Sequence, residues 1–164
     1  FSTMATYMYE DAVKLPVALF VVELLTTVAR HEHENRQLFE FVDASIDVLE
    51  LDGEHTANFH LVFMTMLTRL VGIAPDEETY AAGSWLDLRE GCFTLLRPAH
   101  QDVAQPEVAR RIALFLRGGF EGVAMPMNRD ERNCCLDALM DYYRLHLPSF
   151  PELKSVAILR QLFQ

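Results

Sequence analysis

The sequence has few cysteines and no apolar run long enough to cross a membrane. Its 164 residues include Cys92, Cys134 and Cys135, and no two of them have the C-x-x-C spacing of a zinc ribbon or a redox pair. We therefore expect a reducing, cytoplasmic setting, with the neighbouring cysteines packed in or beside the core. The longest mainly apolar stretch, Leu15 to Ala29, is interrupted by Glu23 and falls short of the roughly 20 residues that a bilayer crossing needs, so no membrane contact is expected.

Internal repeats and low-complexity tracts are also missing from the sequence. The chain begins at Phe1 without an initiator methionine, a basic segment or a cleavage site, and we expect it to be a fragment of a longer protein. Apolar residues make up 51% of the sequence and charged residues 23%, which is typical of a globular protein and not of a disordered one. We expect a single domain over residues 1–164, because a folded chain of this size hides roughly 70% of its unfolded surface.

Signatures of common catalytic and metal sites are absent from the sequence. There is no G-x-S-x-G elbow, and Gly118–Gly122 lacks the preceding strand and the Lys-Ser/Thr pair of a phosphate-binding loop. The run His31–Glu34 could be mistaken for a metal cluster, but successive helical residues diverge and the H-E-x-x-H spacing is missing. His60 and His146 are isolated among apolar neighbours and are expected to be structural. We therefore do not expect an enzyme.

What the sequence does have is helical periodicity. Apolar residues recur at 3.6-residue spacing in at least five segments and a short sixth one, which predicts an all-α bundle of about six helices. Pro16 suits the first turn of the first helix, Asp52-Gly53 is a candidate C-cap of the second, and Asn58 is a candidate N-cap of the third. The later helices are expected at Phe59–Leu70, Glu107–Arg117 before Gly118-Gly119, Asp130–Leu147 and Glu152–Phe163.

A different pattern lies between the third and fourth predicted helices. From Trp85 to Leu95, apolar residues alternate around a turn that contains Gly91, which predicts one small β-hairpin. Because two strands alone are marginally stable in water, the hairpin should lie against the helices.

Charge is distributed unevenly along the chain. The net charge is −10, and residues 30–54 hold two arginines and eight acids, whereas residues 97–117 hold four arginines and two acids. Because nucleic-acid affinity comes largely from clustered basic residues, we expect this domain to bind DNA poorly by itself. Arg110 and Arg117 share one face of the fourth helix. They are either a small basic footprint or simply the solvated side of an amphipathic helix.

Three stretches of the chain carry a family pattern. They are Asn58–Leu61 leading into Arg69–Gly72, Leu86–Gly91, and Asp141–Pro148 followed by Glu152–Ser155 and Leu159–Phe163. In residues, order and spacing, they resemble the helical C-terminal domain of the RecO family of DNA repair and recombination mediators. The resemblance extends over most of residues 10–163.

The resemblance implies a cytoplasmic mediator that helps to load recombinase onto single-stranded DNA coated by single-strand-binding protein. It also implies work with RecR and annealing of complementary strands. Family members join a DNA-binding N-terminal OB-fold to the helical domain, and that OB-fold is absent from this sequence, so contact with single-stranded DNA is expected mainly through the missing part. In some relatives the helical domain holds zinc with four cysteines. Since Cys92 alone falls in the hairpin region, we expect no zinc and no other cofactor.

In some relatives the helical domain also docks the tail of single-strand-binding protein. A tail that is acidic and ends in an aromatic residue needs an apolar pocket for the ring and a cation for the carboxylate. We expect it to dock where the last three predicted helices meet, with these cations as candidates: Arg110, Arg117, Arg144, Lys154 and Arg160. Alternatively, Arg144 and Lys154 simply pair with Asp141 and Glu152, and each pair is then worth at most ~1 kcal/mol.

A second class of function stays open at this point. An all-helical ligand-sensing or regulatory domain would have a hydrophobic interior pocket lined by a few converging polar groups. A surface groove beside arginines would favour the mediator domain instead.

Overall fold

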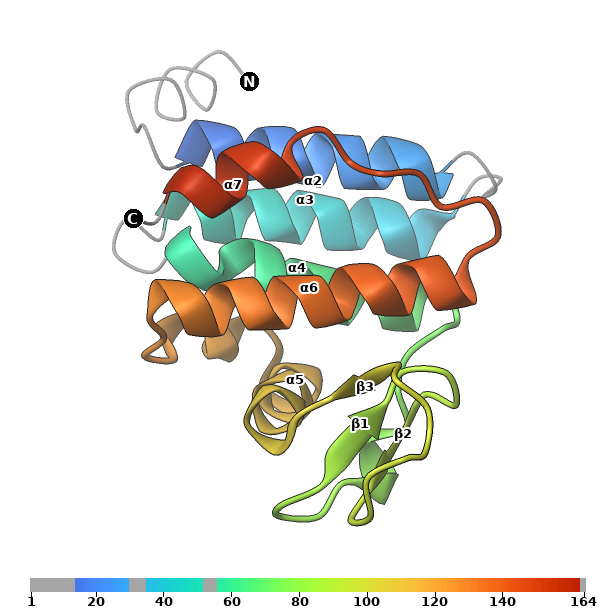
Figure 1. Ribbon diagram of the computed structural model, residues 1–164. Coiled ribbons are helices and arrows are strands. Elements are labelled where there is room, and N and C mark those ends of the chain that lie inside the picture. Colours follow the sequence, from blue (N-terminus) through green and yellow to red (C-terminus); the bar gives the residue numbers. More distant parts are fainter. Residues whose placement is uncertain (1–13, 30–34, 52–55, 163–164) are drawn as a thin grey trace.

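The computed structural model describes residues 14–29, 35–51 and 56–162, and most of these residues are helical (Figure 1). The α-helices in these ranges are α2 (Lys14–Ala29), α3 (Arg36–Leu51), α4 (Phe59–Leu70), α5 (Pro106–Gly118), α6 (Arg129–His146) and α7 (Val156–Leu162). The short 3-10 helices are η1 (Thr56–Asn58), η2 (Glu77–Thr79) and η3 (Gly119–Ala124). The strands are β1 (Trp85–Asp87), β2 (Cys92–Thr94) and β3 (Val103–Ala104). The predicted all-α bundle with a small β insertion is confirmed.

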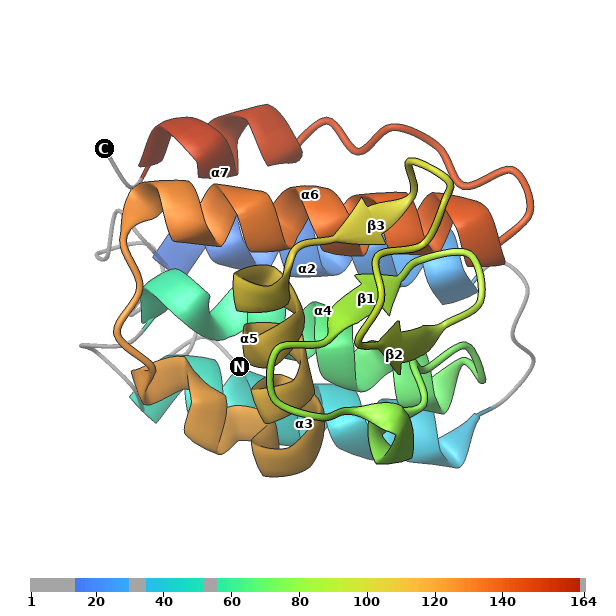
Figure 2. The same cartoon turned by 60° about the horizontal axis from the view of Figure 1, so that its bottom comes forward.

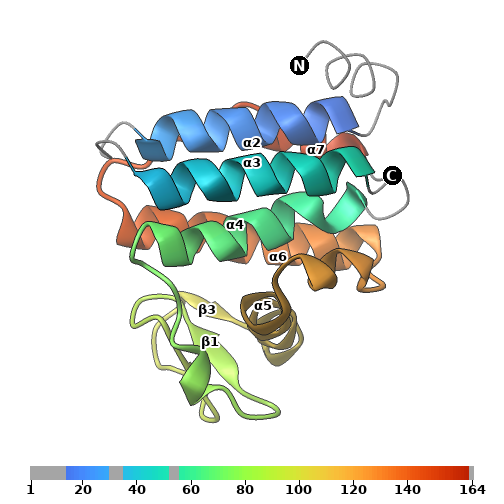
Figure 3. The same cartoon turned by 180° about the vertical axis from the view of Figure 1, so that it is seen from behind.

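Helix α4 lies at the centre of the molecule. It contacts α2, α3, α5 and α6, and nine of its 12 residues are buried. A helix that is apolar on nearly every side must be surrounded by other elements, and Figure 3 shows α4 next to α3 with α6 behind it. Helix α5 crosses the direction of the other helices, and the small sheet lies beside it (Figure 2).

The predicted hairpin exists and is part of a larger sheet. Strand β1 pairs antiparallel with β2, as expected, and its other edge pairs antiparallel with β3, so the strand order is β2-β1-β3. Two residues are too few to show a period-2 pattern, which is why β3 was not predicted. The turn between β1 and β2 contains Gly91 at a φ of +68°, a conformation that favours glycine.

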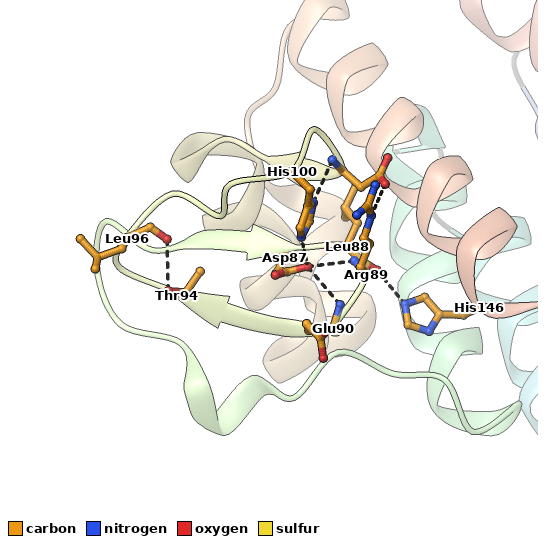
Figure 4. A network of polar contacts seen from close by, with 9 residues as sticks. Asp87, Leu88, Arg89, Glu90, Thr94, Leu96, His100 and His146 are labelled. Carbon is orange, nitrogen blue, oxygen red and sulfur yellow. Dashed lines mark hydrogen bonds and ion pairs between the residues drawn. The ribbon is translucent and has the colours of Figure 1, made fainter.

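Polar contacts fasten the hairpin turn (Figure 4). One carboxylate oxygen of Asp87 accepts hydrogen bonds from the backbone N–H groups of Arg89 and Glu90, both at 3.0 Å, and lies 3.0 Å from Nε2 of His100. Burial raises the pKa of Asp87, but the backbone donor of Glu90 and the contact with His100 outweigh it, so the net pKa is lowered. On α6, Nε2 of His146 lies 2.7 Å from the carbonyl oxygen of Leu88. These contacts anchor the turn to the neighbouring loop and to the bundle.

The expected N-cap role of Asn58 is wrong. Its backbone is already helical because η1 precedes α4, and its side chain makes no capping hydrogen bond. The amide instead donates to the carbonyl oxygens of Val123, at 3.3 Å, and Met125, at 2.6 Å, and accepts from Nε of Arg132 at 2.9 Å. Asn58 is only 3% exposed, so these tertiary contacts satisfy a buried amide and tie η1 to η3 and α6.

The last helix begins later than predicted, at Val156 and not at Glu152. The residues before it are held in a turn by Glu23 of α2, whose carboxylate accepts from the backbone N–H groups of Lys154 at 3.1 Å and Ser155 at 3.0 Å. The candidate cap Asp52-Gly53 and the run His31–Glu34 lie outside the described residues.

Candidate functional site

The five predicted partner-binding cations lie in three separate places. Arg144, Lys154 and Arg160 line a groove between α6 and α7 with a volume of about 470 Å³. Arg117 lines a different groove, between α3, α4 and the end of α5. Arg110 is exposed, and its Nη2 atom lies 3.4 Å from Glu107 on the same helix. The structure therefore does not gather the five cations at one junction of the last three helices.

The groove between α6 and α7 carries charges of both signs. Its apolar part includes the buried side chains of Met140 and Leu153. Arg144 pairs with Asp141 at 3.0 Å, as the alternative interpretation expected, and Arg160 pairs with Asp137. These partners are substantially exposed, so each pair is worth at most ~1 kcal/mol.

Lys154 does not follow that alternative. Burial raises the pKa of the nearby Glu23, but the hydrogen bonds from Ser155 and from the backbone of Lys154 outweigh it, so the net pKa is lowered. The positive charge of Lys154 adds to this lowering, which places Lys154 close to Glu23. Glu152, the expected partner of Lys154, instead lines the groove together with Asp137. Two carboxylates thus stand among the three cations of this groove.

The second groove, here called the α3–α5 groove, is mainly apolar. Its volume is about 560 Å³, and it is lined by Phe41, Ala44, Met66, Arg69, Leu70, Leu116, Arg117, Gly118, Gly119 and Phe120. Its lining contains two arginines and no carboxylate. The groove can therefore receive an apolar group beside an anion.

Aromatic rings join the floor of the α3–α5 groove to the core. The ring of Phe41 stacks on Phe63 with centroids 5.0 Å apart, and on Phe120 at 6.0 Å. Phe59 completes the set, with its centroid 6.1 Å from Phe63 and 5.6 Å from Phe120. Rings held on more than one side are preorganised, so a bound aromatic side chain would meet a rigid apolar surface.

The glycines at the end of α5 shape this floor. Helix α5 ends at Gly118, with Gly119 as its C-cap at a φ of +56°, which confirms the predicted termination at Gly118-Gly119. A Cβ atom at Gly119 would lie 3.4 Å from Cε of Met66, in a backbone conformation that L side chains rarely adopt. The sharp turn directs the chain into η3 and brings Phe120 next to Phe41.

Both arginines of the α3–α5 groove converge on one residue of η2. Nη2 of Arg69 lies 2.9 Å from Oε2 of Glu77, and Nη2 of Arg117 donates to the backbone carbonyl oxygen of Glu77 at 3.3 Å. The guanidinium of Arg117 also lies 5.3 Å from the ring centroid of Tyr80, in a cation–π contact. Both guanidinium groups of the groove therefore lie beside Glu77.

Sequence reasoning found Arg117 but missed Arg69, Phe41 and Phe120 as parts of a site. One signal was present: Arg69 and Arg117 each stand in the last turn of a helix that ends at a glycine or two residues before one. Two neighbouring helices that end in this way can place their cations together. Which helix ends are neighbours cannot be known from periodicity.

A third groove, of about 610 Å³, lies between η1, η3 and the start of α6. Its polar groups already serve the fold, because Asn58 bonds the carbonyl oxygens of η3 and its end, and Nε of Arg132 bonds Asn58. Burial lowers the pKa of Arg132 from its ordinary value. This groove is the largest of the three, but Asn58 and Arg132 in its lining already bond within the protein and have fewer polar atoms left for a ligand.

The two candidate histidines lie in structural surroundings. His60 is 1% exposed and meets Phe20 edge to face, and burial, helped by the charge of Arg132, lowers the pKa of His60 to about 3. His146 bonds the hairpin turn and stacks on Tyr142 with ring centroids 4.1 Å apart. A neutral buried ring and a ring fastened to backbone both support the structural interpretation.

The expected placement of the neighbouring cysteines in or beside the core is confirmed for Cys135 and wrong for Cys134. Cys135 is buried, and burial raises the pKa of its thiol to about 12, whereas its neighbour Cys134 is exposed. Within residues 14–29, 35–51 and 56–162, no group of three or more His, Cys, Asp or Glu side chains could hold a metal ion. In the same described part of the chain, no helix is both long enough and apolar enough to cross a membrane.

Comparison with known proteins gives a consistent result. The family model described as "Recombination protein O C terminal" matches residues 9–156. The chain is similar to the DNA repair protein RecO of Phocaeicola vulgatus, with 42% identity over 154 residues, and to that of Bacteroides fragilis, with 42% over 155 residues. It is also similar to the DNA repair protein RecO of Porphyromonas gingivalis, with 40% identity over 159 residues. Each match covers 93% of this chain and 64% of the relative's length. No solved structure matched the chain.

Proposed function

Because the chain belongs to the RecO family, whose C-terminal domain it matches, we propose that it is the partner-binding module of a DNA repair and recombination mediator. The whole protein would help to load recombinase in the cytoplasm onto single-stranded DNA coated by single-strand-binding protein, together with RecR. Contact with DNA would come mainly from an OB-fold outside this chain. The module itself would act through protein contacts and not as an enzyme.

The observation that carries the proposal is the pairing of an aromatic floor with two converging arginines in the α3–α5 groove. The tail of single-strand-binding protein, as the family resemblance describes it, is acidic and apolar, and we take it to end in an aromatic residue with a free carboxylate. The ring would lie against Phe41 and Phe120, and the carboxylate would lie between Arg69 and Arg117. Such a carboxylate needs charge-assisted hydrogen bonds, because burying it unpaired is costly.

The groove between α6 and α7 is the second candidate for the same tail, because three of the five predicted cations line it. It fits less well, since Asp137 and Glu152 share its lining and would repel an acidic segment. The lining of the α3–α5 groove contains no carboxylate, the nearby Glu77 pairs with Arg69 from outside it, and its apolar surface is larger.

A ligand-sensing domain is the other class of function to weigh. It would enclose its ligand in an interior cavity with converging polar groups. The three grooves described above all open to solvent, and the α3–α5 groove has its arginines at the surface. A surface groove beside arginines favours the mediator module.

Isothermal titration calorimetry tests the proposal. An acidic peptide that ends in phenylalanine with a free carboxylate should bind the wild-type chain with a micromolar dissociation constant, which rises with added salt. Arg117→Glu should weaken binding about tenfold or more, because the ligand carboxylate loses one charged donor and meets a like charge. Arg110→Glu is the matched control, since it makes the same change on the same helix outside the groove.

Three outcomes decide the matter. No binding by the folded wild-type chain would remove the proposal. Equal losses of peptide affinity for Arg110→Glu and Arg117→Glu would show that binding depends on the overall charge of the surface and not on the α3–α5 groove. A loss for Arg144→Glu with none for Arg117→Glu would move the site to the groove between α6 and α7.

A further inference from the structure

The carboxylate of Glu77 already pairs with Arg69, one of the two arginines of the α3–α5 groove that a ligand carboxylate would bind. Its Oε2 atom pairs with Arg69 at 2.9 Å, while its carbonyl oxygen accepts from Arg117 at 3.3 Å. An anion that contacts both guanidinium groups must therefore approach the position that Glu77 holds.

We infer that Glu77 is an internal competitor that a ligand carboxylate must displace from Arg69, and that it thereby sets the affinity of the groove for free carboxylates. The inference rests on the proposed function of the α3–α5 groove. It adds Glu77 of η2, which is outside the lining of the groove and acts on it through Arg69.

The contact between Glu77 and Arg69 is of a kind that exchanges readily. The two side chains are 34% and 47% exposed, and pairs this accessible to water contribute little stability. Oε2 of Glu77 is buried but has no aligned hydrogen bond among the described residues, so its contact with Arg69 is a simple ion pair. A ligand that offers Arg69 a better-aligned carboxylate can replace it.

The backbone of Glu77, in contrast, is firmly held. The carboxylate of Asp76 accepts from the N–H of Glu78 at 3.1 Å, and the hydroxyl of Thr79 donates to the carbonyl oxygen of Asp76. The same hydroxyl accepts from the N–H of Phe93 in β2 at 2.8 Å. Displacement therefore needs only a rotation of the Glu77 side chain, and the carbonyl contact with Arg117 can persist.

The inference makes the ligand's terminal group decisive. A peptide with a free terminal carboxylate competes with Glu77 for Arg69, whereas the same peptide with a terminal amide has no charge with which to displace it. Removing the Glu77 charge should thus help the first peptide and hardly affect the second. A general change in surface charge would help both.

The test is a calorimetric titration of Glu77→Gln with two peptides, the acidic sequence ending in phenylalanine as the free acid and as the amide. We expect the free acid to bind about three- to fivefold more tightly than it binds wild type, which is the largest gain that an exposed pair allows. The dissociation constant of the amide should change by less than about twofold, because many exposed ion pairs contribute almost nothing measurable. Glu78→Gln, next in sequence and exposed, is the matched control and should change neither.

The outcomes separate this inference from the proposed function. If wild type binds the free acid and Arg117→Glu weakens it, but Glu77→Gln has no effect or helps both peptides equally, only the inference on Glu77 is wrong. If wild type binds neither peptide, the inference on Glu77 and the proposed function are both wrong. Glu77→Ala, which removes the carboxylate without adding an amide, should reproduce the result of Glu77→Gln.

Discussion

The carboxylate of Glu23 fastens α7 to the bundle, and its loss should have a measurable and pH-dependent cost. Glu23 of α2 accepts three hydrogen bonds from the turn before α7: the backbone N–H groups of Lys154 and Ser155, and the hydroxyl of Ser155 at 2.7 Å. In Glu23→Gln the amide oxygen can keep the two contacts with Ser155, while the amide nitrogen would face the N–H of Lys154, donor against donor.

The magnitude follows from these three contacts. One hydrogen bond is lost, and two that were made to a charged group become neutral, at a difference of about 0.5–1.5 kcal/mol each. Glu23 is partly exposed, so solvent screening reduces the sum, and we expect a loss of about 1–2 kcal/mol in the free energy of unfolding. For a chain of this size that corresponds to a fall of about 2–8 °C in Tm.

The pH dependence gives the sharper test. The folded pKa of Glu23 lies below its ordinary value of 4.5, since the donors of Ser155 and Lys154 outweigh the effect of burial. Its contribution is therefore fully present above pH 4.5 and is lost as the pH falls through the lower folded pKa. Thermal melts followed by circular dichroism should show wild type and Glu23→Gln apart at pH 7 and converging in acid.

Glu152→Gln is the matched control, because it neutralises an exposed carboxylate in the same connection and should leave Tm unchanged at both pH values. A gap between wild type and Glu23→Gln that stays constant down to pH 3 would refute the assignment of the cost to an ionised Glu23. Peptide binding in the α3–α5 groove should survive this variant, since α7 does not line that groove.

Four further predictions concern the core, the hairpin and the ligands of the chain. Tyr143→Phe should cost about 1 kcal/mol in urea unfolding, because the buried hydroxyl donates to the carbonyl oxygen of Met64 at 2.6 Å; no loss would mean that this bond adds nothing net. Gly91→Ala should cost about 2 kcal/mol, since its φ is +68° and the new Cβ would lie 2.9 Å from the hydroxyl of Tyr142. In a Tyr142→Phe background the cost of Gly91→Ala should shrink, and strictly additive losses in the double variant would contradict the steric part of the argument. Elemental analysis should find no stoichiometric zinc, and strong chelator should leave the helical circular dichroism unchanged. The isolated chain should bind single-stranded oligonucleotides weakly at about 150 mM salt, where submicromolar affinity would show that its net charge of −10 does not govern binding.

The helices could be predicted from the sequence because their stripes of apolar residues are long. The predicted segment Phe59–Leu70 matches α4, and Glu107–Arg117 lies within α5. The errors fall where tertiary contacts override local preference. Asn58 has the right residue type for a cap, but the carbonyl oxygens at the end of η3 and the guanidinium of Arg132 use its amide.

The candidate site was harder to predict than the fold. Periodicity places Arg110 and Arg117 on one face of their helix, and it does not tell which of them lies beside Phe41 of α3. The crossing of α5 over the bundle decides that, and it brings Arg117 to the end of α4, next to Arg69. The separation of the five candidate cations is likewise a property of helix packing, which no single segment encodes.

The small sheet contains the single tryptophan of the chain, and this gives the molecule a built-in optical reporter. Trp85 opens β1, where the guanidinium of Arg97 lies 5.3 Å from its ring centroid. Intrinsic fluorescence excited at the red edge of absorption therefore reports on the sheet alone, whereas the far-ultraviolet signal reports on the helices. Coincident transitions from the two probes would show that the hairpin unfolds together with the bundle, and an early change in emission would show that the sheet is a separate cooperative unit.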